Sequence, residues 1–100
     1  MRIGISVQSA YRVSDPAEGV RYMLERAEAA NQADLDSLFV GDHHVTDYAY
    51  YQNSPILARM LAHWFDKPAG ALYLLPLWHP VLLAEQIATL AAIMPGRFIM

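Results

Sequence analysis

The sequence predicts an α/β fold in which parallel strands alternate with helices, as in the N-terminal half of a (β/α)8 TIM barrel. Short runs rich in apolar residues recur at residues 2–8, 35–41, 70–77 and 97–100. Amphipathic helix patterns with capping and proline signals separate them. The 100 residues hold half of the alternation that fills a barrel of about 250 residues. We therefore expect residues 1–100 to form part of a barrel domain, with a small complete four-stranded α/β domain as the alternative.

The first half of the chain has the pattern strand, helix, strand, loop. Residues 2–8 carry β-branched side chains typical of a buried strand. Asp15 then supplies an N-cap acceptor directly before Pro16, and the apolar stripe that follows predicts a helix to about residue 31. Residues 35–41 return to a strand pattern. Residues 42–53 are predicted to form a long, irregular polar and aromatic loop, and long loops often carry functional residues.

The second half repeats the pattern. The tripeptide Asn-Ser-Pro at residues 53–55 is a capping signal that predicts a second helix to about Phe65. Residues 70–77 are apolar on both faces, as is typical of a strand in a parallel sheet. His79 and the proline after it open a third helix, which ends at the Pro-Gly pair of residues 95–96. We expect His79 to cap this helix.

Composition and charge exclude several classes of protein. With 7 basic and 10 acidic residues the net charge is -3, so neither nucleic acid nor an anionic membrane surface is an expected partner. The longest apolar run, residues 69–78, contains a proline and is far shorter than the roughly 20 residues of a membrane span. The chain has no cysteine, and its first residues lack a signal-peptide pattern. We therefore expect a cytoplasmic protein without disulfides or cysteine-based zinc sites.

Residues able to do chemistry follow three of the predicted strands. Parallel strands bring their carboxyl ends to one edge of the sheet, so we expect these loops to meet there. The residues are Gln8, Ser9 and Tyr11 after the first strand, Gly41, Asp42, His43, His44, Thr46 and Asp47 after the second, and Pro76, Trp78 and His79 after the third. The sequence therefore predicts a functional site at this edge.

The sharpest local feature of that edge is the tripeptide Asp42-His43-His44. Histidine exchanges protons near neutral pH, and a neighbouring carboxylate can fix its tautomer. Adjacent residues of extended backbone point to opposite sides, so we expect one histidine to face the pocket and the other to pack or hydrogen-bond beneath the loop. The plainer interpretation is two structural loop histidines. A metal site is not expected, because no third histidine lies at helical spacing and cysteine is absent.

The long loop also carries three tyrosines, Tyr48, Tyr50 and Tyr51. They offer an aromatic face for a planar ligand, although tyrosines in a loop also serve simply to pack it. No glycine-rich phosphate loop occurs in the chain.

Four motifs are distinctive in combination. They are Leu-Phe-Val-Gly-Asp-His-His-Val-Thr at residues 38–46, Asn-Ser-Pro at 53–55, Leu-Pro-Leu-Trp-His-Pro at 75–80 and Met-Pro-Gly-Arg-Phe at 94–98. With these motifs the whole chain resembles the N-terminal part of a luciferase-like monooxygenase, of the bacterial luciferase superfamily. Where that family commonly has a glycine before the second strand, this chain has Asp34, a residue type that tolerates left-handed backbone.

The resemblance implies a (β/α)8 barrel and a flavin-dependent oxidoreductase. In such an enzyme reduced FMN reacts with oxygen to oxidise a small organic substrate, and hydride transfer by coenzyme F420 is the alternative within the class. The resemblance makes His43 the catalytic residue beside the flavin ring, and Asp42, His44, Ala71 and Leu72 cofactor-binding residues. It also implies a non-proline cis peptide at Ala71-Leu72.

The resemblance further implies a homodimer formed through the second and third helices, and flavin-phosphate residues that follow residue 100. One alternative comes from a different class of protein. In that alternative the 100 residues are a truncated fragment that binds no cofactor and acts as an interaction module through its exposed fourth strand and apolar helix faces.

Overall fold

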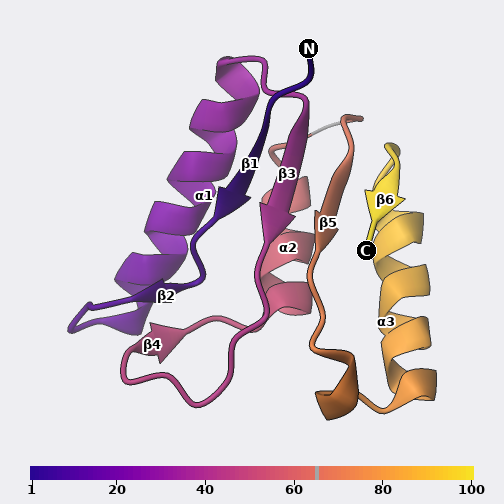
Figure 1. The fold of residues 1–100 in the computed structure, drawn as a ribbon. Helices are drawn as coiled ribbons and strands as arrows, with labels where there is room; N and C mark the ends of the chain where they lie inside the picture. Colours follow the sequence, from indigo (N-terminus) through magenta and orange to yellow (C-terminus); the bar gives the residue numbers. More distant parts are fainter. Residues whose placement is uncertain (65) are drawn as a thin grey trace.

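The main sheet has four parallel strands whose order in space follows their order along the chain (Figure 1). The computed structural model describes residues 1–64 and 66–100. The strands of this sheet are β1 (Gly4–Val7), β3 (Ser37–Val40), β5 (Ala69–Ala71) and β6 (Phe98–Ile99). Each neighbouring pair is parallel. The predicted parallel α/β alternation is therefore confirmed.

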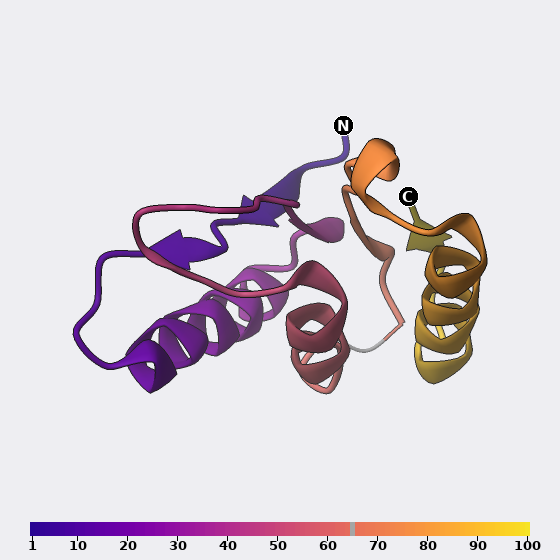
Figure 2. The same cartoon turned by 90° about the horizontal axis from the view of Figure 1, so that it is seen from below.

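The helices connect successive strands and lie on one side of the sheet, as Figure 2 shows. They are α1 (Pro16–Gln32), α2 (Asn53–Leu61) and α3 (Pro80–Ile93). Among the described residues, no helix covers the other face. A sheet with helices on one face only is the layering of a (β/α)8 barrel wall, in which the helices form the outer ring. None of the helices in the described part of the chain is long and apolar enough to cross a lipid bilayer.

The core lies between the sheet and the helices. Leu38 and Val40 of β3 are completely buried, and they belong to the same cluster as Met23 of α1 and Leu57 of α2. Side chains alternate between the two faces of a strand, so the intervening Phe39 points to the face without helices. The register places Ser6, Phe39, Gly70 and Ile99 in one row on that face.

Local sequence signals define the two ends of α1 as predicted. The Asp15 side chain accepts a hydrogen bond of 2.9 Å from the Ala17 backbone N–H, with Pro16 at the first helical position. After the helix, Asp34 adopts the left-handed conformation with φ 57°, so the prediction for this position is confirmed. The Asp34 carboxylate forms an ion pair of 2.9 Å with Lys67.

Helix α2 begins at the predicted Asn-Ser-Pro tripeptide, but no residue of this tripeptide occupies the N-cap. It starts at Asn53, with Gln52 at the N-cap and no side-chain capping bond from that residue, and its last residue is Leu61. Asn53 is buried and uses its side chain for other contacts, described below. The predicted end at Phe65 lies outside the described residues.

The strand predicted at residues 70–77 is wrong beyond Ala71. Strand β5 ends at Ala71, and residues Leu75–Leu77 form a 3₁₀ turn. The backbone N–H of Leu74 donates to a side chain instead of a neighbouring strand, and Pro76 has no N–H to donate. The apolar residues of this segment therefore belong to an exposed connection.

The loop predicted at residues 42–53 contains a short strand that the sequence did not reveal. Strand β4 (Ala49–Tyr50) pairs antiparallel with β2 (Ala10–Tyr11), and Tyr51 N donates to Ser9 O at 3.0 Å. This ribbon lies beyond the ends toward which β1 and β3 point (Figure 1). It joins the loops that follow these two strands.

Two further expectations are corrected by the structure. His79 occupies the N-cap of α3, but its side chain makes no capping bond, and only its carbonyl oxygen accepts from Leu83 N, at 3.0 Å. The expected cis peptide at Ala71-Leu72 is not found, and all described peptide bonds are trans. In the trans form Leu72 N donates to Val40 O at 3.0 Å and so extends the strand pairing, whereas a non-proline cis bond costs about 3 kcal/mol.

Candidate functional site

A cavity of about 530 Å³ opens at the carboxyl ends of β1 and β3. Its lining comes from the end of β1 and from the residues that follow β1 and β3, and includes Ser9, Gly41, His43, Val45, Thr46 and Tyr48. The prediction that the loops after the first two strands of the sheet meet at this edge is therefore confirmed.

His43 presents its ring to this cavity. A Cβ atom added to Gly41 would lie 3.0 Å from His43 Nε2, so the absence of a side chain at Gly41 makes room for the ring. The backbone N–H of His43 donates to the Tyr50 hydroxyl at 3.1 Å, and the ring meets that of Tyr50 edge-on. Tyr50 thus fixes the backbone from which His43 projects.

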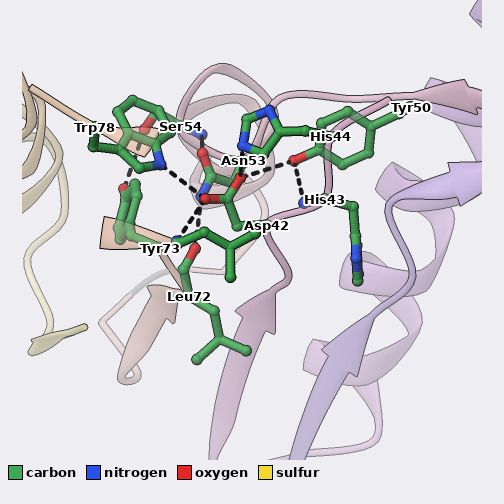
Figure 3. Close-up of polar contacts among 10 residues, drawn as sticks. Asp42, His43, His44, Tyr50, Asn53, Ser54, Leu72, Tyr73 and Trp78 are labelled. Carbon is green, nitrogen blue, oxygen red and sulfur yellow. Dashed lines mark hydrogen bonds and ion pairs between the residues drawn. The ribbon is translucent and has the colours of Figure 1, made fainter. Parts of the chain in front are cut away.

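Asp42 is buried behind the cavity and joins two loops through its carboxylate (Figure 3). Its Oδ2 accepts hydrogen bonds of 2.8 Å from both Leu74 N and Trp78 Nε1. Its Oδ1 accepts one of 3.3 Å from the Tyr50 hydroxyl. The loop after β3 is therefore tied to the connection between β5 and α3.

These contacts determine the charge state of Asp42. Burial alone would raise the pKa of its carboxyl group, but the hydrogen bonds from Leu74 and Trp78, the nearby His44 and the Tyr50 hydroxyl outweigh burial and lower it. Asp42 is consequently a carboxylate at neutral pH. Burial has the dominant effect on Tyr50, whose pKa is raised, so its hydroxyl keeps its proton.

His44 points away from the cavity, toward Asp42. Its Nε2 lies 3.0 Å from Asp42 Oδ1, close enough for an ion pair when the ring is protonated, but its N–H direction does not meet the geometry of a hydrogen bond. One histidine thus faces the cavity and the other packs behind it, as predicted. The next residue, Val45, is exposed and has φ 52°, a strained conformation for a β-branched side chain.

A second polar cluster holds the segment after β5 against the start of α2. The buried Asn53 donates from Nδ2 to Leu72 O at 2.7 Å and accepts from Ser54 N at 2.8 Å. The Ser54 and Tyr73 hydroxyls lie 3.1 Å apart, and the Tyr73 ring meets the Trp78 ring edge-on (Figure 3). This cluster and Asp42 together fix the connection that leads into α3.

The three loop tyrosines have different positions. Tyr48 lines the cavity, and the Arg12 guanidinium lies 4.3 Å from the centre of its ring. Tyr50 belongs to the Asp42 network, and Tyr51 donates to Pro16 O at 2.5 Å. Only Tyr48 is therefore placed to contact a ligand in this cavity.

Of the five residues to which the family resemblance gives a catalytic or cofactor-binding role, one lies in the cavity. His43 lines it, whereas Asp42 and His44 lie behind it. Ala71 is buried in the core, and Leu72 is exposed beyond the end of β5; neither lines the cavity. Within residues 1–64 and 66–100, no three His, Asp or Glu side chains gather in a way that could hold a metal ion.

Sequence reasoning missed the supporting role of Asn53, because Asn-Ser-Pro was interpreted only as a capping signal. It also missed the links that Tyr50 and Trp78 make to Asp42. The Trp78 link spans 36 residues of sequence. The only sequence signal for this link was the tryptophan within the motif Leu-Pro-Leu-Trp-His-Pro at residues 75–80.

Comparison with known proteins identifies the family. The model of the luciferase-like monooxygenase family matches residues 1–100, so the chain belongs to this family. The resemblance inferred from the four motifs is thereby confirmed.

Solved structures share the fold. The chain is similar to apo-MsnO8, with a TM-score of 0.87 and 24% sequence identity. It is also similar to the oxygenating constituent of 3,6-diketocamphane monooxygenase from Pseudomonas putida, with a TM-score of 0.81 and 19% identity. The latter is a type II Baeyer-Villiger monooxygenase in complex with FMN. Each match covers 99% of this chain, which spans 31% and 29% of the two structures respectively. No curated protein matches the chain by sequence.

Proposed function

We propose that this protein is a flavin-dependent monooxygenase in which reduced FMN reacts with oxygen and a small organic substrate is oxidised. The observation that carries the proposal is the position of His43, whose ring faces a cavity at the carboxyl edge of the sheet in a chain of the luciferase-like monooxygenase family. The carboxyl edge is where barrel enzymes place their active sites. The FMN in the 3,6-diketocamphane monooxygenase structure supports the choice of cofactor.

The cavity suits one end of a planar ring system. Val7, Ala10 and Val45 give it apolar walls, while His43 and Tyr48 add flat side chains with polar atoms. In this proposal these residues border the flavin ring, which supplies oxygen activation when reduced. Ala71 and Leu72, at the end of β5, are proposed to support the cofactor from the neighbouring strand.

The chain's own contribution is to hold the His43 imidazole beside the reacting group. Tyr50 fixes the His43 backbone, and Asp42 in turn accepts a hydrogen bond from Tyr50. The role proposed for the His43 ring nitrogens is to accept or deliver a proton. Asp42 and His44 act in this proposal through the loop that they stabilise.

We also propose that the protein forms a homodimer through α2 and α3. An apolar groove of about 500 Å³ lies between these helices, with Pro55 and Ala58 on one side and Leu82 and Ile93 on the other. Leu82 and Ile93 are both more than half exposed. A second copy of the chain would remove this surface from water.

An assay of product formation tests the function. With reduced FMN supplied continuously and candidate aldehydes and ketones as substrates, we expect substrate-dependent product formation by the intact protein. Replacement of His43 by alanine should lower turnover by at least about 100-fold, the typical contribution of a general acid or base. The affinity for FMN, measured by fluorescence quenching, should change far less.

His63→Gln is the matched control, because His63 lies beyond α2 and its ring contacts Arg59. Unchanged turnover in His43→Ala would contradict the assignment of His43. Activity with reduced F420 in place of reduced FMN would establish the hydride-transfer alternative. Absence of binding to either cofactor would favour the interaction-module alternative.

A further inference from the structure

Ser9 carries a hydroxyl group that is buried without a hydrogen-bond partner. The residue is 2% exposed, and its Oγ makes no hydrogen bond. Its backbone is held in place, because Ser9 O accepts from Tyr51 N at 3.0 Å. Buried hydroxyls are nearly always paired, so an unpaired one beside a cavity calls for a partner.

The His43 ring is the neighbouring group that can supply this partner. A Cβ atom on Gly41 would lie 3.9 Å from Ser9 Oγ and 3.0 Å from His43 Nε2, so both atoms flank the same point above Gly41. Both residues also line the cavity. Because glycine places no side chain between them, the exposed His43 ring has space to turn its Nε2 toward the hydroxyl.

Other hydroxyls of the cavity are less suited to this role. Thr46 Oγ1 already donates to Tyr48 O at 2.8 Å. Ser6 lines the cavity too, but it is exposed, so water satisfies its hydroxyl. Ser9 alone among these three combines burial with a free donor.

We infer that Ser9 is a positioning residue for His43, donating its hydroxyl proton to Nε2. A neutral imidazole has one donor and one acceptor nitrogen, and a hydrogen bond at one of them determines the state of the other. With Nε2 as the acceptor, the ring proton resides on Nδ1. The catalytic meaning of this tautomer rests on the proposed function, whereas the Ser9–His43 contact does not.

Nitrogen NMR of the intact protein labelled with ¹⁵N-histidine tests the contact directly. At a pH where the ring is neutral, the chemical shifts of the two His43 nitrogens report which one carries the proton. We expect the wild type to favour the Nδ1 proton, and Ser9→Ala to reduce the ratio of the two tautomers about fivefold, as for loss of one hydrogen bond. Ser9→Thr should restore it, and Ser6→Ala, the matched control, should leave it unchanged.

The same His43 shifts in Ser9→Ala and in the wild type would overturn the inference. Ser9→Ala removes one hydroxyl and, by this inference, a single hydrogen bond to an exposed ring, so the variant should still fold, with at most a small change in melting temperature. Gly41→Ala provides a second test, since its new Cβ would crowd His43 Nε2 and displace the ring from Ser9. It should reduce the tautomer ratio in the same direction, and no change in this variant would also contradict the contact.

These measurements need neither flavin nor turnover. A tautomer change in Ser9→Ala together with full activity of His43→Ala would leave the contact standing and remove the proposed catalytic role. Reduced activity of His43→Ala with no tautomer change in Ser9→Ala would support the proposed function and remove Ser9 from it. The two hypotheses therefore fail separately.

Discussion

Asp42 Oδ2 accepts a hydrogen bond of 2.8 Å from the indole N–H of Trp78, which lies 36 residues further along the chain. This contact joins the loop after β3 to the turn that precedes α3. The same carboxylate oxygen accepts the Leu74 backbone N–H, and the other oxygen accepts from Tyr50, which holds His43. The position of the candidate catalytic histidine therefore depends on a network that spans two loops.

Asp42→Asn should destabilise the protein by about 2 kcal/mol, the range expected for hydrogen bonds to a charged group. An amide has only one oxygen, so it cannot accept from Trp78 and Leu74 on one side and from Tyr50 on the other. Urea denaturation followed by tryptophan fluorescence measures the change. Asp47→Asn is the control, because Asp47 is an exposed carboxylate of the same loop, and it should shift stability by less than about 0.5 kcal/mol.

Stability should fall at acidic pH in a way that depends on Asp42. The pKa of its carboxyl is lowered in the folded state, so the folded protein binds fewer protons than the unfolded chain. This contribution is fully present above the unfolded pKa of about 3.9 and is lost as the pH falls toward the folded pKa. The difference in free energy of unfolding between wild type and Asp42→Asn should therefore shrink below about pH 4.

Asp34 also has a lowered pKa, through its hydrogen bond and charge interaction with Lys67, but it is exposed. Solvent screens such pairs. The stability of Asp34→Asn should therefore fall at acidic pH nearly as much as that of the wild type. A constant difference between wild type and Asp42→Asn from pH 7 to pH 2.5 would contradict the assigned charge state of Asp42.

Val45→Asn should stabilise the protein by about 1 kcal/mol, since left-handed backbone costs a residue with a Cβ about 1–2 kcal/mol and asparagine tolerates it better. Val45 has φ 52° and is fully exposed, so no buried apolar contact is lost. Thermal unfolding measures the gain. Val81→Asn, an exposed valine within α3, is the matched control and should bring no increase in melting temperature.

The sequence predicted the features that depend on residues adjacent along the chain. Asp15 before Pro16 located the start of α1, and the tolerance of aspartate for left-handed backbone explained Asp34. Apolar composition did not distinguish a strand from the exposed connection that follows Ala71. The residues of β2 and β4 are too few for a periodic pattern, so their pairing was not visible.

The candidate site was predicted only in its position. Parallel topology places the loops at one edge, and the alternation of side chains gave His43 and His44 opposite directions. The partners of Asp42 come from distant loops, so its burial and lowered pKa emerge only in the folded chain. The unpaired hydroxyl of Ser9 depends in the same way on how Gly41 and His43 approach it.

The proposed homodimer predicts that a charge in the helix groove prevents association. Leu82 is 56% exposed and lines the groove between α2 and α3, so Leu82→Glu would bury a carboxylate in an apolar contact on dimerisation. Burying an unpaired charge is strongly unfavourable. Light scattering coupled to size-exclusion chromatography should show a dimer for the wild type and a monomer for this variant. Leu77→Glu, exposed to a similar degree but outside the groove, should remain dimeric; a monomeric wild type would contradict the proposal.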